Sequence, residues 1–149
     1  MGMSERFPQK VALDGAGRPA LVANSYGKGK TLLSAYLLES YLSVQPAVFE
    51  SPESTHLLYR ALAEWAGIKP MFSTTDPVVE VAGLAAGRRG YAVLANHSPE
   101  LKKITVISSL ALRQVNQLTA QGLQPMLLHY CAWRMDIPAY DGAIVEWSL

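Results

Sequence analysis

The sequence has little cysteine and no excess of charge of either sign. Its 149 residues include one cysteine, Cys131, which excludes an internal disulfide and a zinc site built from cysteines. The 13 lysine and arginine residues are balanced by 12 acidic residues, so the net charge is +1. No overall field then favours nucleic acid or an anionic membrane. A lone cysteine suits a reducing compartment, and we expect a cytoplasmic protein.

Long apolar runs are also missing, although 50% of the residues are hydrophobic. No run approaches the roughly 20 residues that a membrane-spanning helix requires. The N-terminal segment Met1–Arg6 lacks the apolar core of a signal peptide. We therefore predict no membrane partner and no nucleic-acid partner.

The polar residues form no recognisable catalytic or metal-binding set. The histidines are scattered over separate segments: His56, His97 and His129. Glycoside chemistry requires two carboxyl groups roughly 5–9.5 Å apart across a sugar. The spacing pairs none of the candidate glutamates: Glu39, Glu50, Glu80 and Glu146. We predict no catalytic residue, no metal and no cofactor.

The segment Pro19–Thr31 has two interpretations. Gly29-Lys30-Thr31 matches the second half of a phosphate-binding loop, whose lysine meets the outer phosphates of a nucleotide. The first glycine of that motif is replaced by Asn24, and no apolar strand ending in aspartate is present to hold Mg²⁺. The other interpretation is a β-hairpin with arms at 21–23 and 31–36, joined by a glycine-containing turn. The residues favour the hairpin.

One helix is well signalled after Ser51, which can cap it, and Pro52, which suits its first turn. Gly67 ends the pattern and Pro70 follows. The apolar residues recur at helical spacing on one face: Leu57, Leu58, Ala61, Leu62 and Trp65.

Short β-type runs separated by turn residues fill the rest of the chain: 78–81, 91–96, 104–108, 126–133 and 143–147. They predict an antiparallel sandwich or a small barrel. The run Met126–Trp133 is almost continuously apolar, so we expect it to be a central strand. At the end of the run 91–96, Asn96 and His97 are expected to satisfy backbone groups. A linker is expected within Phe72–Pro77.

Three stretches resemble the C-terminal part of the family 42 glycoside hydrolases, which are multidomain β-galactosidases. The segment Ala20–Thr31, with a Tyr-Gly-Lys-Gly turn, resembles a late hairpin of their amidotransferase-like α/β domain. The segment Leu57–Pro70, with Ala-Gly-Ile near its end, resembles the closing helix of that domain. The strand end Leu-Ala-Asn-His at 94–97 and the run Ala143–Trp147 resemble the terminal β-sandwich.

The resemblance implies an α+β protein of two parts. Residues 1–72 would be a remnant of the α/β amidotransferase-like domain, which mediates trimerisation in that family, and residues 73–149 a small antiparallel β-sandwich. The barrel that carries the catalytic glutamates of the family has no counterpart in the sequence, so no catalytic residue is carried over. The implied function is a non-catalytic accessory and assembly module of a β-galactosidase-like glycoside hydrolase.

The partners follow from this interpretation. We expect self-association or contact with a missing (β/α)-barrel domain. Five apolar residues are the candidate interface: Val22, Leu32, Leu57, Leu58 and Trp65. The alternative function is a carbohydrate-binding sandwich, with four candidate aromatic residues: Tyr91, Tyr130, Trp133 and Tyr140. A third interpretation is nucleotide binding through Lys30 and Thr31.

Overall fold

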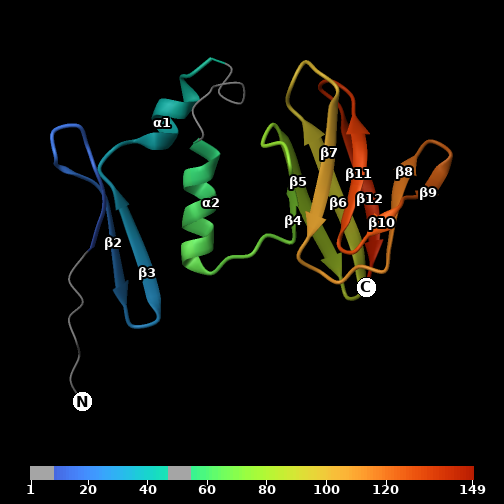
Figure 1. Ribbon diagram of the computed structural model, residues 1–149, viewed down its shortest axis with the longest axis horizontal. Helices are drawn as coiled ribbons and strands as arrows, with labels where there is room; N and C mark the ends of the chain where they lie inside the picture. Colours follow the sequence, from blue (N-terminus) through green and yellow to red (C-terminus); the bar gives the residue numbers. More distant parts are fainter. Residues whose placement is uncertain (1–8, 47–54) are drawn as a thin grey trace. The chain divides into compact units, whose positions relative to one another are not determined.

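The computed structural model describes residues 9–46 and 55–149 (Figure 1). Of the described residues, 52% are in strands and 14% are in helices, and these ranges hold two helices. The predicted α+β class is therefore wrong, because the protein is mostly antiparallel β-sheet. The part expected to be α/β contributes an antiparallel sheet of its own, and polar segments that were not predicted as strands, such as Gln114–Thr119, also pair in the sheets.

The chain divides into two compact units, Met1–Val48 and Phe49–Leu149. The helix α2 (Thr55–Ala66) falls within the second unit, together with all the strands that follow it. The division by packing thus comes before the helix, whereas the family resemblance places it after the helix. The predicted domains, 1–72 and 73–149, stay a prediction about how the parts are related to known domains.

The first unit is built on a three-stranded antiparallel sheet in the order β1-β2-β3. Its strands are β1 (Gln9–Leu13), β2 (Pro19–Tyr26) and β3 (Gly29–Ser34). Gly27 in the β2–β3 turn has a φ of 58°, a left-handed conformation that glycine adopts without steric cost. The predicted hairpin is confirmed. A short helix α1 (Leu38–Ser43) follows the sheet.

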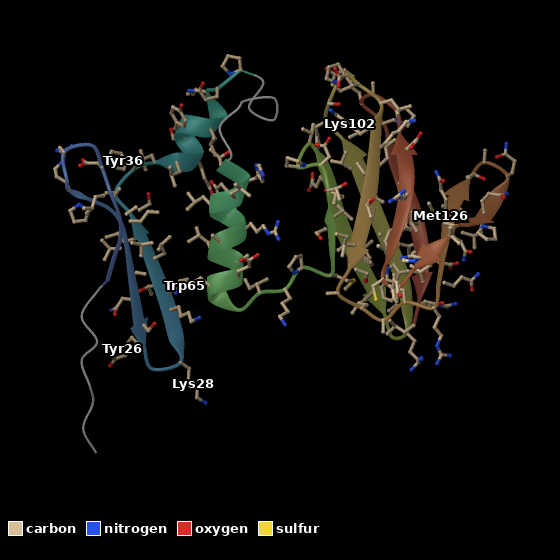
Figure 2. All side chains as sticks on the ribbon, in the orientation of Figure 1. Tyr26, Lys28, Tyr36, Trp65, Lys102 and Met126 are labelled. Carbon is tan, nitrogen blue, oxygen red and sulfur yellow. The ribbon has the colours of Figure 1, made fainter. Side chains whose placement is uncertain are left out.

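The nucleotide interpretation of this hairpin is wrong. A phosphate-binding loop leads into a helix whose N-terminal amides face the phosphates. Here Lys30 and Thr31 lie within β3, and Thr31 is paired with Asn24 of β2. Lys28 lies at the exposed tip of the turn (Figure 2). No helix N-terminus follows the glycines at this point.

Asp14 organises the loop between β1 and β2. One carboxylate oxygen accepts hydrogen bonds from the backbone amides of Ala16 and Arg18, at 2.9 and 2.8 Å. The other accepts from the Arg18 guanidinium and from the Tyr36 hydroxyl, each at 2.8 Å. These hydrogen bonds lower the pKa of Asp14 to about 2. The bond from the Arg18 amide has the largest effect, followed by the bonds from the Tyr36 hydroxyl and the Arg18 side chain. Asp14 therefore ties the loop to Tyr36, two residues after the end of β3.

The helix predicted near residues 52–66 is confirmed as α2, and its expected cap at Ser51 lies outside the described residues. Gly67 follows the helix with a φ of 82°. Its amide donates to the Glu64 carbonyl at 3.0 Å, and the amide of Ile68 donates to the Ala63 carbonyl at 2.8 Å. These two bonds satisfy carbonyls that the helix end would otherwise leave unpaired. Within the described ranges, neither helix is long and apolar enough to cross a bilayer.

The second unit contains two antiparallel sheets (Figure 1). The four-stranded sheet has the order β10-β11-β7-β4. Its strands are β4 (Phe72–Thr74), β7 (Lys102–Ser108), β10 (Leu128–His129) and β11 (Ala132–Ile137). The five-stranded sheet has the order β5-β6-β12-β8-β9. Its strands are β5 (Val79–Ala86), β6 (Arg89–Asn96), β8 (Gln114–Thr119), β9 (Gly122–Pro125) and β12 (Gly142–Ser148).

The inward residues of both sheets form one core, which makes the unit a β-sandwich. Trp133 of β11 and Trp147 of β12 are each 1% exposed. Phe72 of β4 contacts both indoles edge to face, with ring centroids 5.6 and 6.1 Å away. Burying a side chain of tryptophan size stabilises the fold by about 4–6 kcal/mol before entropy is counted. The aromatic trio therefore joins the two sheets.

The run Met126–Trp133 is not the single central strand that we predicted. The backbone turns at Tyr130, whose φ is 56°, and β10 pairs back onto β11. Leu127 and Tyr130 are strongly exposed, so the apolar run does not mark burial. The buried strand is β11, in which Trp133, Met135 and Ile137 alternate with exposed polar residues. Strict alternation was the better signal for this strand.

Candidate functional site

The outer face of the five-stranded sheet gathers aromatic, polar and aliphatic side chains. Along β6, Gly90, Ala92 and Leu94 are buried, whereas Tyr91 and Val93 are exposed. This alternation follows from the two-residue period of a strand. The residues that pair with Tyr91 and Val93 on neighbouring strands therefore share the same outer face.

Strand register assembles two rows across this face. The first row carries the polar and aromatic groups: Leu84, Tyr91, Glu146, Asn116 and Pro125. The second row lies two residues away from the first on every strand and is aliphatic throughout: Ala82, Val93, Ile144, Leu118 and Leu123. All five members of the second row are solvent-exposed. The face is thus divided into a polar row and an apolar row.

Hydrogen bonds hold part of the polar row in place. The Gln114 side-chain amide donates to Asn116 Oδ1 at 3.0 Å, and Asn116 Nδ2 lies 3.5 Å from Glu146 Oε2. Both distances join neighbouring groups on the same face of the sheet. Within residues 9–46 and 55–149, no side chain forms an ion pair with Arg89 or a hydrogen bond with the Tyr91 hydroxyl. These groups are available to a ligand.

A hollow of about 330 Å³ lies at the end of this face, beside the β5–β6 turn. Its lining includes Tyr91, Glu146, Arg89 and Leu84. Gly90, which is buried, also borders the hollow between Arg89 and Tyr91. An aromatic ring, a carboxylate, a guanidinium and an aliphatic side chain therefore meet around one concavity.

The four aromatic residues predicted to bind carbohydrate do not form one platform. Trp133 is buried in the core, so its ring cannot stack on a ligand. Tyr130 is 86% exposed in the β10–β11 turn, whereas Tyr140 is 72% exposed in the loop after β11. They lie near opposite ends of β11, about 20 Å apart for a strand of this length. Tyr91 is 43% exposed and, of the four, it alone lines the hollow.

The five predicted interface residues are divided between the two units. Val22 pairs with Leu33, whereas Leu32 pairs with Ala23. Because neighbouring residues of a strand point to opposite faces, Val22 and Leu32 lie on opposite sides of the first-unit sheet. The other three lie on α2, where Leu57 is exposed and Leu58 and Trp65 are half-buried.

The histidines lie on separate elements: His56 on α2, His97 after β6 and His129 on β10. His97 follows β6, and its Nε2 lies 3.1 Å from Glu80 Oε2. The part of the chain that the structure describes contains no cluster of three or more histidine, cysteine, aspartate or glutamate side chains able to hold a metal ion. A second concavity of about 430 Å³, on the four-stranded sheet, is lined by His129, Thr105, Arg134 and neighbouring residues. Among the described residues that line it, none is a carboxylate.

Asn96 shows the expected satisfaction of backbone groups at a strand end. Its side-chain amide donates to the carbonyls of Glu100 and Pro138, each at 2.8 Å, and of Ile137 at 3.2 Å. Its Oδ1 accepts from the Ser98 amide at 3.0 Å. Asn96 thereby ties the end of β6 to the loop after β11.

Solved structures with a similar fold are found among β-galactosidases. A β-galactosidase from Bacillus circulans sp. alkalophilus matches 89% of the chain with a TM-score of 0.54 and 25% sequence identity. Gan42B, a GH42 β-galactosidase from G. stearothermophilus, matches 89% with a TM-score of 0.54 and 19% identity. The chain resembles a segment of family 42 β-galactosidases. The resemblance predicted from the sequence is therefore confirmed at the level of the fold.

The likeness covers only a small part of those proteins. The chain spans about 16% of the length of each β-galactosidase chain that it matches. This share fits the predicted C-terminal part of a GH42 protein. No protein-family model and no curated protein matches the sequence. The match to β-galactosidases thus rests on the course of the backbone through both units.

Proposed function

We propose that this chain is a non-catalytic accessory and assembly module of a β-galactosidase-like glycoside hydrolase. The observation that carries the proposal is the likeness in fold over 89% of this chain to 16% of family 42 β-galactosidases. A segment of that size corresponds to one small part of a multidomain enzyme. The module would then contribute contacts and shape, and the reaction would take place elsewhere in the enzyme.

The chemistry of the two concavities supports the non-catalytic part of this proposal. Hydrolysis of a glycosidic bond requires two carboxyl groups, one as acid and one as base or nucleophile. Glu146 is the one carboxylate among the described residues that line the hollow on the five-stranded sheet. Among the described residues that line the concavity on the four-stranded sheet, none is a carboxylate. Neither has the pair that the reaction needs.

The aliphatic row supports the assembly part. Val93, Ile144, Leu118 and Leu123 present a continuous apolar line across four adjacent strands. Contiguous exposed apolar surface of this kind marks an interaction site more often than a free surface. We assign its occupant as a neighbouring domain of the parent hydrolase, because such enzymes extend far beyond the matched segment.

Immunoprecipitation from the source cells tests the proposal. An antibody raised against this chain should precipitate activity towards a chromogenic β-galactoside, well above the level given by preimmune serum. The purified 149-residue chain, assayed alone at the same molar amount, should be inactive. Precipitation of the chain without any β-galactosidase activity would rule out the accessory role. Activity of the purified chain itself would rule out the non-catalytic assignment.

A further inference from the structure

The geometry points to a carbohydrate-binding site in the hollow around Tyr91, Glu146 and Arg89, with a neutral pyranose as its ligand. This inference goes beyond the accessory role and does not depend on it. A module that binds sugar and a module that only assembles would share the same fold. The two properties are therefore tested separately.

Tyr91 supplies a stacking surface. Its side chain stands on the outer face of β6, with Leu84 beside it on β5 and Glu146 beside it on β12. The face of an aromatic ring is electronegative, and the C–H groups on one side of a pyranose are weakly electropositive. A sugar that lies on the Tyr91 ring would also contact the exposed Leu84 side chain. Both contacts favour an apolar sugar face.

Glu146 and Arg89 supply directional hydrogen bonds to the hydroxyl groups of the sugar. The carboxylate of Glu146 accepts from hydroxyls, and Asn116 beside it restricts its orientation. The guanidinium of Arg89 donates to hydroxyl oxygens, and bonds to charged groups are stronger than those between neutral groups. Because Glu146 and Arg89 carry opposite charges, the hollow has no net charge that would select an ion. A neutral polyhydroxylated ring matches this arrangement.

The row of neighbouring side chains Gln114, Asn116 and Glu146 distinguishes this hollow from a surface that only exposes a tyrosine. It places amide groups beside the acceptor next to the ring before any ligand arrives. Small-molecule sites combine an apolar surface with a few positioned polar groups in this way. With one ring and a shallow concavity, we expect dissociation constants in the millimolar range.

The test is a titration of the full ¹⁵N-labelled chain with methyl β-D-galactopyranoside, followed by amide chemical shifts. We expect saturable shifts centred on Tyr91 and Glu146. Tyr91→Ala should weaken binding by about tenfold or more, the equivalent of about 1.4 kcal/mol. Tyr91→Phe keeps the ring and should retain most of the affinity. Glu146→Gln keeps the shape but weakens the acceptor, and should also lower the affinity.

Two other exposed tyrosines offer matched controls. Tyr130→Ala and Tyr140→Ala remove rings that are more exposed than Tyr91 but lie in loops away from the hollow. Neither change should alter the titration. The inference is overturned if no shifts saturate at tens of millimolar sugar, if Tyr91→Ala leaves them unchanged in a folded variant, or if they centre on another surface. The glycosidase immunoprecipitation can succeed or fail independently of all three outcomes.

Discussion

Trp147 of β12 lies directly opposite Gly90 of β6, and the indole occupies the space that a side chain at Gly90 would need. A Cβ atom built at Gly90 would lie 2.6 Å from Trp147 Cζ2 and would also collide with the Leu84 carbonyl oxygen. The backbone of Gly90 is fully enclosed. The glycine is therefore required by packing, because the largest core residue of β12 rests on it.

Gly90→Ala is expected to destabilise the sandwich by about 2–3 kcal/mol, as overpacking of a well-filled core does. One collision is with backbone, which cannot move aside as the end of a flexible side chain can. Urea unfolding followed by tryptophan fluorescence measures the change. Gly15→Ala is the control, since a Cβ there meets no described heavy atom within 4 Å and should shift the free energy of unfolding by less than about 0.5 kcal/mol.

Asn96→Ala should cost about 2–3 kcal/mol of unfolding free energy, because several backbone groups lose their partner in a buried place. Asn96→Asp provides a sharper comparison. An ionised carboxylate would face carbonyl oxygens, so this variant should be less stable at pH 7 than at pH 4, relative to the parent chain. Equal destabilisation at both pH values would mean that the amide does not donate to those carbonyls.

The depressed pKa of Asp14 predicts an acid-dependent loss of order in the first unit. Its folded pKa of about 2 lies below its usual 3.8, so the contribution of this carboxylate is complete above pH 4 and disappears as the pH falls towards 2. Tyr36→Phe removes one donor and should raise the pKa of Asp14 towards 3.8. An NMR titration of the Asp14 carboxyl carbon measures both values. An unchanged pKa in Tyr36→Phe would contradict the hydrogen bond.

The hydrogen bond between Tyr36 and Asp14 should also affect the pKa of Tyr36. Hydrogen bonding to the Asp14 carboxylate raises the pKa of Tyr36 above its usual 10. A raised folded pKa stabilises the fold below pH 10 and this contribution is lost as the phenol ionises at higher pH. In Asp14→Asn, the pKa of Tyr36 measured by ultraviolet titration should fall back towards 10. Tyr26, which is also exposed and belongs to the same sheet, serves as the internal comparison.

Phe72→Leu tests the contacts between the two sheets. It removes edge-to-face contacts with Trp133 and Trp147, each worth about 0.5–1.5 kcal/mol, so the variant should lose about 1–3 kcal/mol. Met135→Leu is the matched control in the same core, with an expected cost below about 1.5 kcal/mol. If both variants lose the same stability, the aromatic geometry contributes nothing beyond volume.

Local patterns predicted local structure well in this chain. The β2–β3 turn and the end of α2 at Gly67 depend on residues close in sequence. The predictions failed where an apolar run was taken as a sign of burial, as in Met126–Trp133. They also failed where the residues of a strand are polar, as in Gln114–Thr119, which pairs on both sides and was not predicted as a strand. Pairing with neighbouring strands, rather than its own composition, makes that segment β.

By itself, the sequence determined the hairpin, one helix, the sandwich strands β5, β6, β7 and β12, and the likeness to family 42 β-galactosidases. Each of these depends on turn glycines, caps and side-chain periods that operate within a few residues. Only the tertiary structure decided that Trp133 is enclosed while Tyr91 is accessible, and that Val22 and Leu32 point to opposite faces. Only strand register could place Tyr91 next to Glu146 and Asn116. Register is set by pairing between distant segments, and no local pattern in any one segment contains that information.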